Sequence, residues 1–262
     1  MSYNCLKIKR HESTEQIVSV VMSRPACGNA LSLELMGELI QAFDSFKYDT
    51  TTRVIIVRGE GKHFCVGADL KDPARKFKEG QANLLERSRA TQLGKDLIQS
   101  VLNLNQISIA AVQGAAAGGG ACIASACDFR IGTDACIIGY PEVKLGMNLS
   151  WGAVPLCFHL IGPARAKRMI IGGELESAEK LLDWGFLDEA VAIDGLNDAC
   201  DTMAKFYASR PALAAQMIKR SLNALQTSSA SALMHMDGDQ FVLATQSDDF
   251  KEQRAAFLDK NK

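Results

Sequence analysis

Two short segments rich in small residues stand out as places where main-chain N–H groups could meet a ligand. His63–Lys71 reads HFCVGADLK, and Gln113–Cys122 reads QGAAAGGGAC. Each follows an apolar run, Val54–Arg58 or Ile107–Val112, so each is expected to lead from a buried strand into a helix. Small residues let a ligand approach the backbone closely. Two such turns, brought together, could offer one N–H each to a single oxygen, as in an oxyanion hole.

A third segment, Tyr140–Gly146, reads YPEVKLG and supplies a carboxylate at Glu142. Taken alone, this glutamate is best explained as a solvated residue that stabilises a helix start. The glycines Gly118–Gly120, taken alone, are best explained by close helix–strand packing. A dinucleotide site is disfavoured because Ile123 stands where the GxGxxG pattern needs its last glycine, and no Walker A motif is present.

Composition narrows the function classes. The chain has 262 residues, 47% hydrophobic and 23% charged, with a net charge of −1, which is typical of a globular protein with no nucleic acid or acidic membrane surface as partner. The eight cysteines form no CxxC pair and the histidines are isolated, so we expect reduced thiols, no metal and a cytoplasmic location. Ile107–Cys127 contains too many glycines for a membrane span, and no apolar leader is expected at the N-terminus.

Strand and helix patterns alternate in the first half of the chain, and helical patterns dominate from about residue 150. The expected strands are Ile17–Met22, Val54–Arg58, Ile107–Val112 and Asp128–Thr133. The expected helices are Leu33–Tyr48 capped by Ser32, most of Asp72–Gln106, Gly119–Ala126, Ala164–Ile171, Ala178–Trp184 capped by Ser177, Leu196–Ser209 and Ala212–Thr227. This order predicts an α/β core over residues 1–195 with a helical C-terminal region over residues 196–262.

The three segments together resemble the crotonase (enoyl-CoA hydratase/isomerase) family. The pattern of that family can also be followed in Ser23–Leu31, at Cys127-Asp128 and in Ala255–Lys260, and so over nearly the whole chain. The resemblance implies a spiral of β-β-α turns followed by helices that build a homotrimer or a dimer of trimers. It also implies an acyl-CoA thioester as substrate, with coenzyme A as part of the substrate and no other cofactor.

The resemblance assigns roles to particular residues. The two oxyanion N–H groups map to Ala68 and Gly119, and the catalytic carboxylate maps to Glu142. The residues expected to bind the substrate and its coenzyme A are Cys27, Lys62, Ala68, Asp69, Leu70, Lys71, Gly119, Phe257 and Lys260. Ala26 stands where the family often has a lysine, so one phosphate contact is expected to be missing.

The chain departs from the hydratase pattern at the acid/base. Hydratases of the family hold a water between two glutamates; Glu142 matches one, and Cys122 stands at the place of the other. A thiol with a pKa near 8.5 is a poor substitute for a carboxylate that must activate water. Ser150 also replaces an acid that other isomerases use, within Asn148–Trp151, where the family usually has proline and glycine.

A single glutamate suits Δ3,Δ2-enoyl-CoA isomerisation, because one base can move a proton between the two ends of a dienolate. Two alternatives stay open: hydratase or CoA-ester lyase chemistry with Glu142 alone, and a catalytically weak acyl-CoA-binding protein. If the protein is a hydratase, a second acid is expected at Asp72, Glu79 or Glu86.

Overall fold

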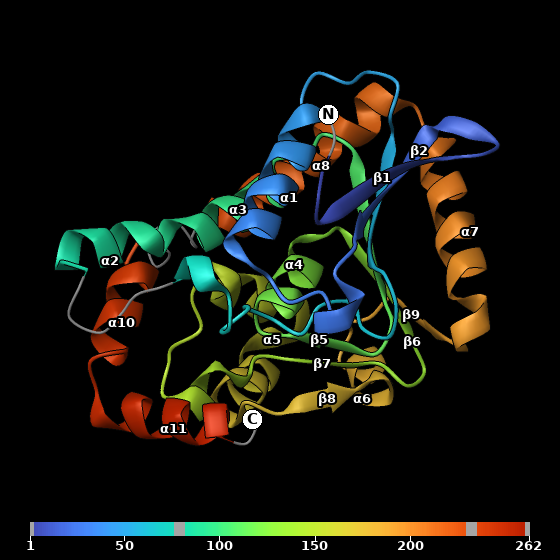
Figure 1. Ribbon diagram of the computed structural model, residues 1–262. Helices are drawn as coiled ribbons and strands as arrows, with labels where there is room; N and C mark the ends of the chain where they lie inside the picture. Colours follow the sequence, from blue (N-terminus) through green and yellow to red (C-terminus); the bar gives the residue numbers. More distant parts are fainter. Residues whose placement is uncertain (1–2, 76–81, 229–234, 260–262) are drawn as a thin grey trace.

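The computed structural model describes residues 3–75, 82–228 and 235–259. The fold is built on a six-stranded sheet in the order β1-β2-β3-β4-β6-β9 (Figure 1). β1 (Leu6–His11) and β2 (Thr14–Met22) pair antiparallel, whereas all later neighbours pair parallel. The later strands are β3 (Val54–Gly59), β4 (Ile107–Val112), β6 (Phe129–Thr133) and β9 (Glu189–Val191).

A smaller sheet gives the chain its spiral. It contains β5 (Ala115–Ala117), β7 (Ile137–Gly139) and β8 (Leu175–Ser177) in the order β5-β7-β8. A single bridge between Cys65 and Ala116 adds the segment after β3 to this sheet. Each turn of the chain thus runs through a long strand, a short strand and then a helix, so the expected spiral of β-β-α turns is confirmed.

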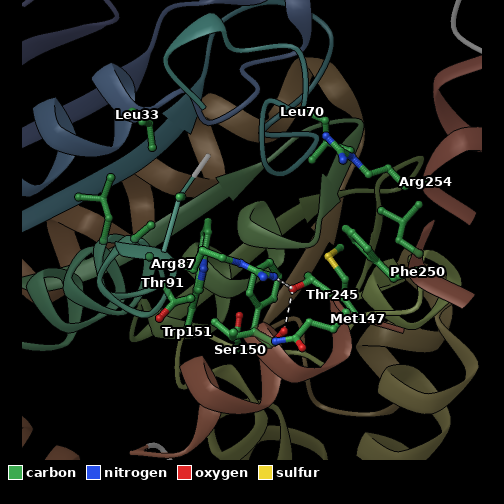
Figure 2. Close-up of a pocket in the computed structure, with 18 of the residues that line it drawn as sticks. Leu33, Leu70, Arg87, Thr91, Met147, Ser150, Trp151, Thr245, Phe250 and Arg254 are labelled. Carbon is green, nitrogen blue, oxygen red and sulfur yellow. Dashed lines mark hydrogen bonds between the residues drawn. The ribbon is translucent and has the colours of Figure 1, made fainter. Parts of the chain in front are cut away.

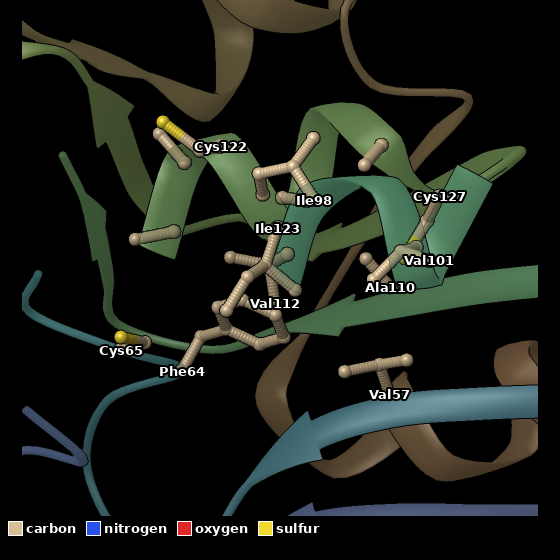
Figure 3. Packing of buried hydrophobic residues seen from close by; sticks show 14 of the residues in the cluster. Val57, Phe64, Cys65, Ile98, Val101, Ala110, Val112, Cys122, Ile123 and Cys127 are labelled. Atoms are coloured by element: carbon tan, nitrogen blue, oxygen red, sulfur yellow. The ribbon is translucent and has the colours of Figure 1, made fainter. Parts of the chain in front are cut away.

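Side chains of the long strands alternate between two cores, as the period of an extended chain requires. In β3, Ile55 and Val57 join the larger core, whereas Val54 and Ile56 join the smaller one. Figure 3 shows part of the larger core, where α3 (Gln92–Leu102) and α4 (Gly119–Ala126) pack over β3 and β4. α1 (Leu33–Ser45) covers the same face, with Ser32 Oγ accepting from the Leu35 N–H at 3.1 Å.

The smaller core lies beneath α7 (Leu196–Ala208), on the opposite face of the long sheet (Figure 1). Leu196, Cys200 and Ala204 of this helix are buried against the sheet. α7 follows the expected boundary at residue 195 and shares the core of the residues before it. The division of the chain at that residue stays a prediction.

The remaining C-terminal helices reach back over earlier elements. α8 (Ala212–Ser228) is fixed by Lys219, whose Nζ lies 2.6 Å from Asp128 Oδ2. α10 (Asp237–Ala244) packs on α2 (Leu84–Ala90), and α11 (Asp248–Asp259) packs on η3 (Pro141–Leu145). α11 therefore covers the segment that carries Glu142.

Most expected elements are confirmed, with ends shifted by a few residues. Two regions differ. Asp72–Gln106 contains η2 (Pro73–Arg75), α2 and α3, and residues 76–81 lie outside the described part. The helix expected to start after Gly162-Pro163 is preceded by another, so that α5 spans Ala153–Gly172. Gly162 interrupts α5 with φ 77° and ψ 170°, because the following proline disfavours helical geometry there.

The other elements connect these layers: η1 (Pro25–Cys27), α6 (Ala178–Asp183) and η4 (Ile193–Gly195). Ser177 accepts from the Lys180 N–H at the start of α6, so this predicted cap is also confirmed. No helix in the described ranges has the length and apolar character needed to cross a membrane.

Candidate active site

Glu142 lies in the first turn of η3, with its carboxyl group directed towards the glycines that precede α4. A Cβ atom on Gly118 would lie 2.9 Å from Glu142 Oε1. Glu142 Oε2 is buried and has no hydrogen-bond partner among the described residues. Burial raises the pKa of this carboxyl group to about 7, so it can change protonation state near neutral pH. A solvated glutamate at a helix start would show neither property.

The two small-residue turns lie together beside this carboxylate. Gly67, next to Ala68, is close to the start of α4: a Cβ atom on Gly67 would lie 3.8 Å from Gly119 N. Gly118 has φ 53° and ψ −119°, a conformation that side chains disfavour, and it turns the chain so that α4 begins at Gly119. Within the described part of the chain, neither the Ala68 N–H nor the Gly119 N–H has a backbone acceptor. The structure therefore brings Ala68, Gly119 and Glu142 together.

Hydrogen bonds hold the first turn in place. The Leu31 N–H donates to Gly67 O at 2.8 Å, and the Asp69 N–H donates to Leu31 O at 3.0 Å. The Asp69 carboxylate pairs with Arg24 at 2.9 Å and so ties the turn to the loop around η1. Asp69, expected to bind substrate, thus has a structural partner in this chain.

The other expected coenzyme A residues fall into two groups. Cys27, Lys62, Leu70 and Lys71 are exposed, on two segments joined where the Val66 N–H donates to Gly28 O at 3.1 Å. These segments form one continuous surface beside Ala68. In the second group, Phe257 lies in α11, and Lys260 lies outside the described residues.

Cys122 lies in α4, in an apolar environment beneath the carboxylate. Its side chain is 1% exposed, and burial, with a further contribution from Glu142, raises the pKa of its thiol well above the ordinary value. Cys157 and Tyr140 are buried beside it, and the Tyr140 hydroxyl is hydrogen-bonded to Ser125. A thiol that stays neutral cannot act as the base that a carboxylate would supply at this position.

The other carboxylates considered as a second acid have structural roles where they are described. Asp72 Oδ2 accepts from the Leu33 N–H at 2.8 Å, at the start of α1. Glu86 accepts from the Asn83 N–H at 2.8 Å within a capping box that starts α2. Glu79 lies outside the described residues.

A cavity of about 590 Å³ lies between α1, α2, α3, α10 and α11 (Figure 2). Ala68, Gly119 and Glu142 do not line it, but Trp151, which packs on Gly119, does. Its wall is mostly apolar, with a few polar and cationic side chains. The residues that line it include Leu33, Met36, Leu70, Arg87, Thr91, Leu93, Gly94, Ser150, Trp151, Thr245, Phe250, Lys251 and Arg254. The cavity has the size and character of a small-molecule pocket.

Trp151 forms the part of this wall that packs on Gly119, at the start of α4. A Cβ atom on Gly119 would lie 2.5 Å from Trp151 Cζ3, and one on Gly94 would lie 2.0 Å from Trp151 Cε2. The indole ring thus fills space left open by two glycines. Trp151 has φ 62°, an unusual value for a bulky residue, so the surrounding structure must hold it there.

Asp237, at the start of α10, helps to hold this loop. Its Oδ2 atom accepts from the Gly152 N–H at 2.8 Å, and Asn148 Nδ2 donates to Asp237 O at 3.3 Å. Burial raises the pKa of the Asp237 carboxyl group. The hydrogen bond from the Gly152 N–H lowers this pKa, but the effect of burial is larger. Sequence patterns give no signal for Asp237 or for the α2, α10 and α11 residues of the cavity, because only tertiary packing brings these helices to the site.

One buried carboxylate beside two N–H groups without backbone acceptors is a site suited to stabilising an enolate. Comparison with known proteins agrees with this class of site: a model of the enoyl-CoA hydratase/isomerase family matches residues 12–262. The chain therefore belongs to that family, whose members act on acyl-CoA thioesters.

Individual relatives carry more than one reaction name. The chain is 32% identical over 256 residues to a probable enoyl-CoA hydratase of Bacillus subtilis, covering 95% of each chain. It is 28% identical to 1,2-epoxyphenylacetyl-CoA isomerase of Escherichia coli, covering 93% of this chain and 92% of that protein. A solved enoyl-CoA hydratase from Mycobacterium avium has the same fold, with a TM-score of 0.86 at 23% identity over 99% of this chain and 97% of that one.

Proposed function

We propose that the protein is a Δ3,Δ2-enoyl-CoA isomerase with Glu142 as its single acid/base. The observation that carries this proposal is the pairing of one buried carboxylate, without a hydrogen-bond partner in the described structure, with a neutral buried thiol at Cys122. Addition of water needs a nucleophile held and activated on one face of the substrate. Proton transfer needs only one base that moves between two carbons.

The reaction starts with the Glu142 carboxylate removing a proton from C2 of a 3-enoyl thioester. The C2–H electrons move toward the thioester carbonyl, whose oxygen accepts from the Ala68 and Gly119 N–H groups. Loss of one such donor typically slows a reaction of this kind about 10²- to 10³-fold. The dienolate then takes the proton back from Glu142 at C4, which leaves the double bond between C2 and C3.

The decisive experiment compares isomerisation of a 3-enoyl-CoA with hydration of crotonyl-CoA by the same preparation. We expect isomerisation to be faster. Glu142→Gln should abolish it while acetoacetyl-CoA, measured by calorimetry, still binds, because the oxyanion donors are untouched. Efficient hydration with no isomerisation would refute the argument from a single carboxylate and would require a second acid elsewhere; hydration is the reaction in the names of several relatives.

The proposal extends to the residues that hold coenzyme A. Cys27, Lys62, Leu70 and Lys71 are proposed to contact it from the surface beside Ala68, with Phe257 and Lys260 reaching it from the C-terminal end. Support comes from the adjacency of the first two segments. Tight binding of acyl-CoA and weak binding of the unesterified acid would agree with this assignment; equal affinities would contradict it.

Assembly and location are also proposed. A homotrimer, or a dimer of trimers, is supported by the apolar face that α8 leaves exposed. All eight cysteines are free, which supports a reducing compartment such as the cytoplasm.

A further inference from the structure

One end of the cavity is polar although most of the wall is apolar. Figure 2 shows Arg87, Thr91, Ser150 and Thr245 on one side of the cavity, apart from Leu70 and Arg254 on the other. The second side adjoins the oxyanion turn, because Leu70 follows Ala68 closely in sequence. Trp151, which packs on Gly119, lies on the first side, so an acyl chain whose thioester lies at Ala68 and Gly119 would pass Trp151 before it meets Arg87.

Arg87 is the charged group on the side of the cavity that contains Trp151. It lies on α2 and is partly buried, and its Nη2 atom donates to Thr245 Oγ1 at 2.9 Å. No carboxylate in the described residues forms an ion pair with it. A guanidinium group has several further N–H donors and is well shaped to hold a carboxylate through two of them.

The charged side chains that line the cavity among the described residues have one sign. The described lining includes Arg87, Lys251 and Arg254 but no aspartate or glutamate. Lys251 pairs with Asp248 at 2.9 Å, outside the lining. An anionic group inside the cavity would therefore meet positive charge without a facing carboxylate among these residues.

We propose that the enzyme acts on acyl-CoA thioesters whose far end carries a carboxylate, and that Arg87 binds this carboxylate. The inference rests on the proposed function for the position of the thioester. An unsubstituted alkyl tail that reached Arg87 would displace water from the guanidinium group and offer no acceptor in return. A terminal carboxylate replaces that water with a charge-assisted hydrogen-bonded pair, while its methylene groups pack on Leu33, Met36, Leu93 and Trp151.

The test uses saturated ligands, so that binding is measured without turnover. Mono-CoA thioesters of dicarboxylic acids are compared by calorimetry with ordinary acyl-CoA thioesters of the same chain length, over a series of lengths. At the length that spans the cavity, we expect the carboxylate-ended thioester to bind roughly tenfold or more tightly. Arg87→Leu should remove this preference, and Arg87→Lys should restore part of it.

Two control variants separate recognition from other roles of Arg87. Arg89→Leu removes the same charge from an exposed position of α2 outside the cavity lining, and it should leave the preference intact. Thr245→Val removes the hydrogen bond between α2 and α10 but keeps the guanidinium group, and it should also leave the preference intact. Loss of the preference in Thr245→Val to the same extent as in Arg87→Leu would show that Arg87 only tethers two helices, and would overturn the proposal.

Equal or tighter binding of the ordinary thioester at every length would also overturn it. The result is separable from the isomerase proposal, because turnover is measured independently with both kinds of 3-enoyl-CoA. A binding preference without isomerisation would refute the proposed reaction alone. Isomerisation without a binding preference would refute the proposed substrate class alone.

Discussion

The Glu142 carboxyl group is harder to ionise in the folded protein than in water, and this property links the proposed proton transfer to stability. Its pKa is raised from 4.5 to about 7 because burial removes the solvent that stabilises the charge. Between these two values the folded state holds a proton that the unfolded state has released. Stability conferred by the protonated group is therefore lost as the pH rises from about 4.5 to about 7.

Glu142→Gln is expected to stabilise the protein at pH 8 by up to about 3 kcal/mol, because the amide never has to ionise in the buried site. At pH 4.5 the difference should disappear. Urea denaturation at both pH values measures it. Glu60→Gln is the matched control, because the pKa of Glu60 is shifted in the opposite direction. Hydrogen bonds from Lys7 and Ser23 lower that pKa, so replacement of the Glu60 carboxylate should not stabilise the protein.

The rate of isomerisation should also follow the titration of Glu142. The carboxylate is the form that removes a proton, so kcat/KM should rise with pH and level off above about 7. The measurement is a pH profile with a 3-enoyl-CoA substrate. A profile that is flat between pH 5 and pH 9 would mean that a different group limits the reaction.

Single residues of the site differ in how well the sequence predicts them. Ala68, Gly119 and Glu142 belong to short local motifs, so their proposed roles follow from the family pattern, and the structure brings the three residues together. Arg87 and Asp237 carry no such signal. Each reaches the site only because α10 packs on α2 and on the loop around Gly152, and that packing depends on residues far apart in the sequence.

At the scale of elements, one buried ion pair fixes α8 to the core. Lys219 Nζ lies 2.6 Å from Asp128 Oδ2 and 2.6 Å from Gln106 O, and the side chain is 4% exposed. Asp128 Oδ2 in turn accepts from the Ser108 N–H at 2.7 Å, at the start of β4. The pair therefore joins α8 to two neighbouring strands.

Lys219→Met should destabilise the protein by about 3–5 kcal/mol, because it leaves the buried Asp128 carboxylate without its partner. Thermal or urea denaturation measures the change. Lys7→Met breaks an ion pair with Glu60 that is largely exposed, and it should cost less than about 1 kcal/mol. Similar losses for the two variants would contradict the special role of the buried pair.

Two helical glycines offer a second comparison. Gly94→Ala would place a Cβ atom 2.0 Å from Trp151 Cε2, so the indole ring must move; we expect a loss of about 1–3 kcal/mol and an altered acyl-chain preference. Gly37→Ala, in α1, meets no atom within 4 Å and should stabilise by about 0.5–1 kcal/mol. Denaturation and ligand titration measure both effects, and an unperturbed ligand preference in Gly94→Ala would contradict the position of Trp151.

Helices and strands were mostly predictable because apolar periodicity and capping residues are local. Ser32 and Ser177 mark helix starts that the structure confirms. The helix before Gly162 is not predicted, because its sequence shows little separation of polar and apolar faces. Pro163 is also typical of the first turn of a helix, whereas here it follows an interruption within α5. The spiral came only from the family resemblance, since strand–helix alternation also fits an ordinary doubly wound sheet.

At the scale of the whole molecule, the face of α8 that points away from the core is unusually apolar for an exposed surface. Leu213, Met217, Leu222 and Leu225 are between 52% and 72% exposed. We expect this face to lie between subunits of a trimer, so light scattering at micromolar concentration should give a mass above that of one chain. The double variant Leu222→Lys and Leu225→Lys should shift the protein toward the monomer. A monomeric wild type would contradict the expectation.

The cavity wall draws on residues from Leu33 near one end of the sequence to Arg254 near the other. During synthesis, the oxyanion turns and Glu142 leave the ribosome well before α10 and α11 do. Until these two helices have been made, the cavity lacks the part of its wall that Phe241, Thr245, Phe250 and Arg254 supply. The wall of the cavity is thus complete only when almost the whole chain has been made.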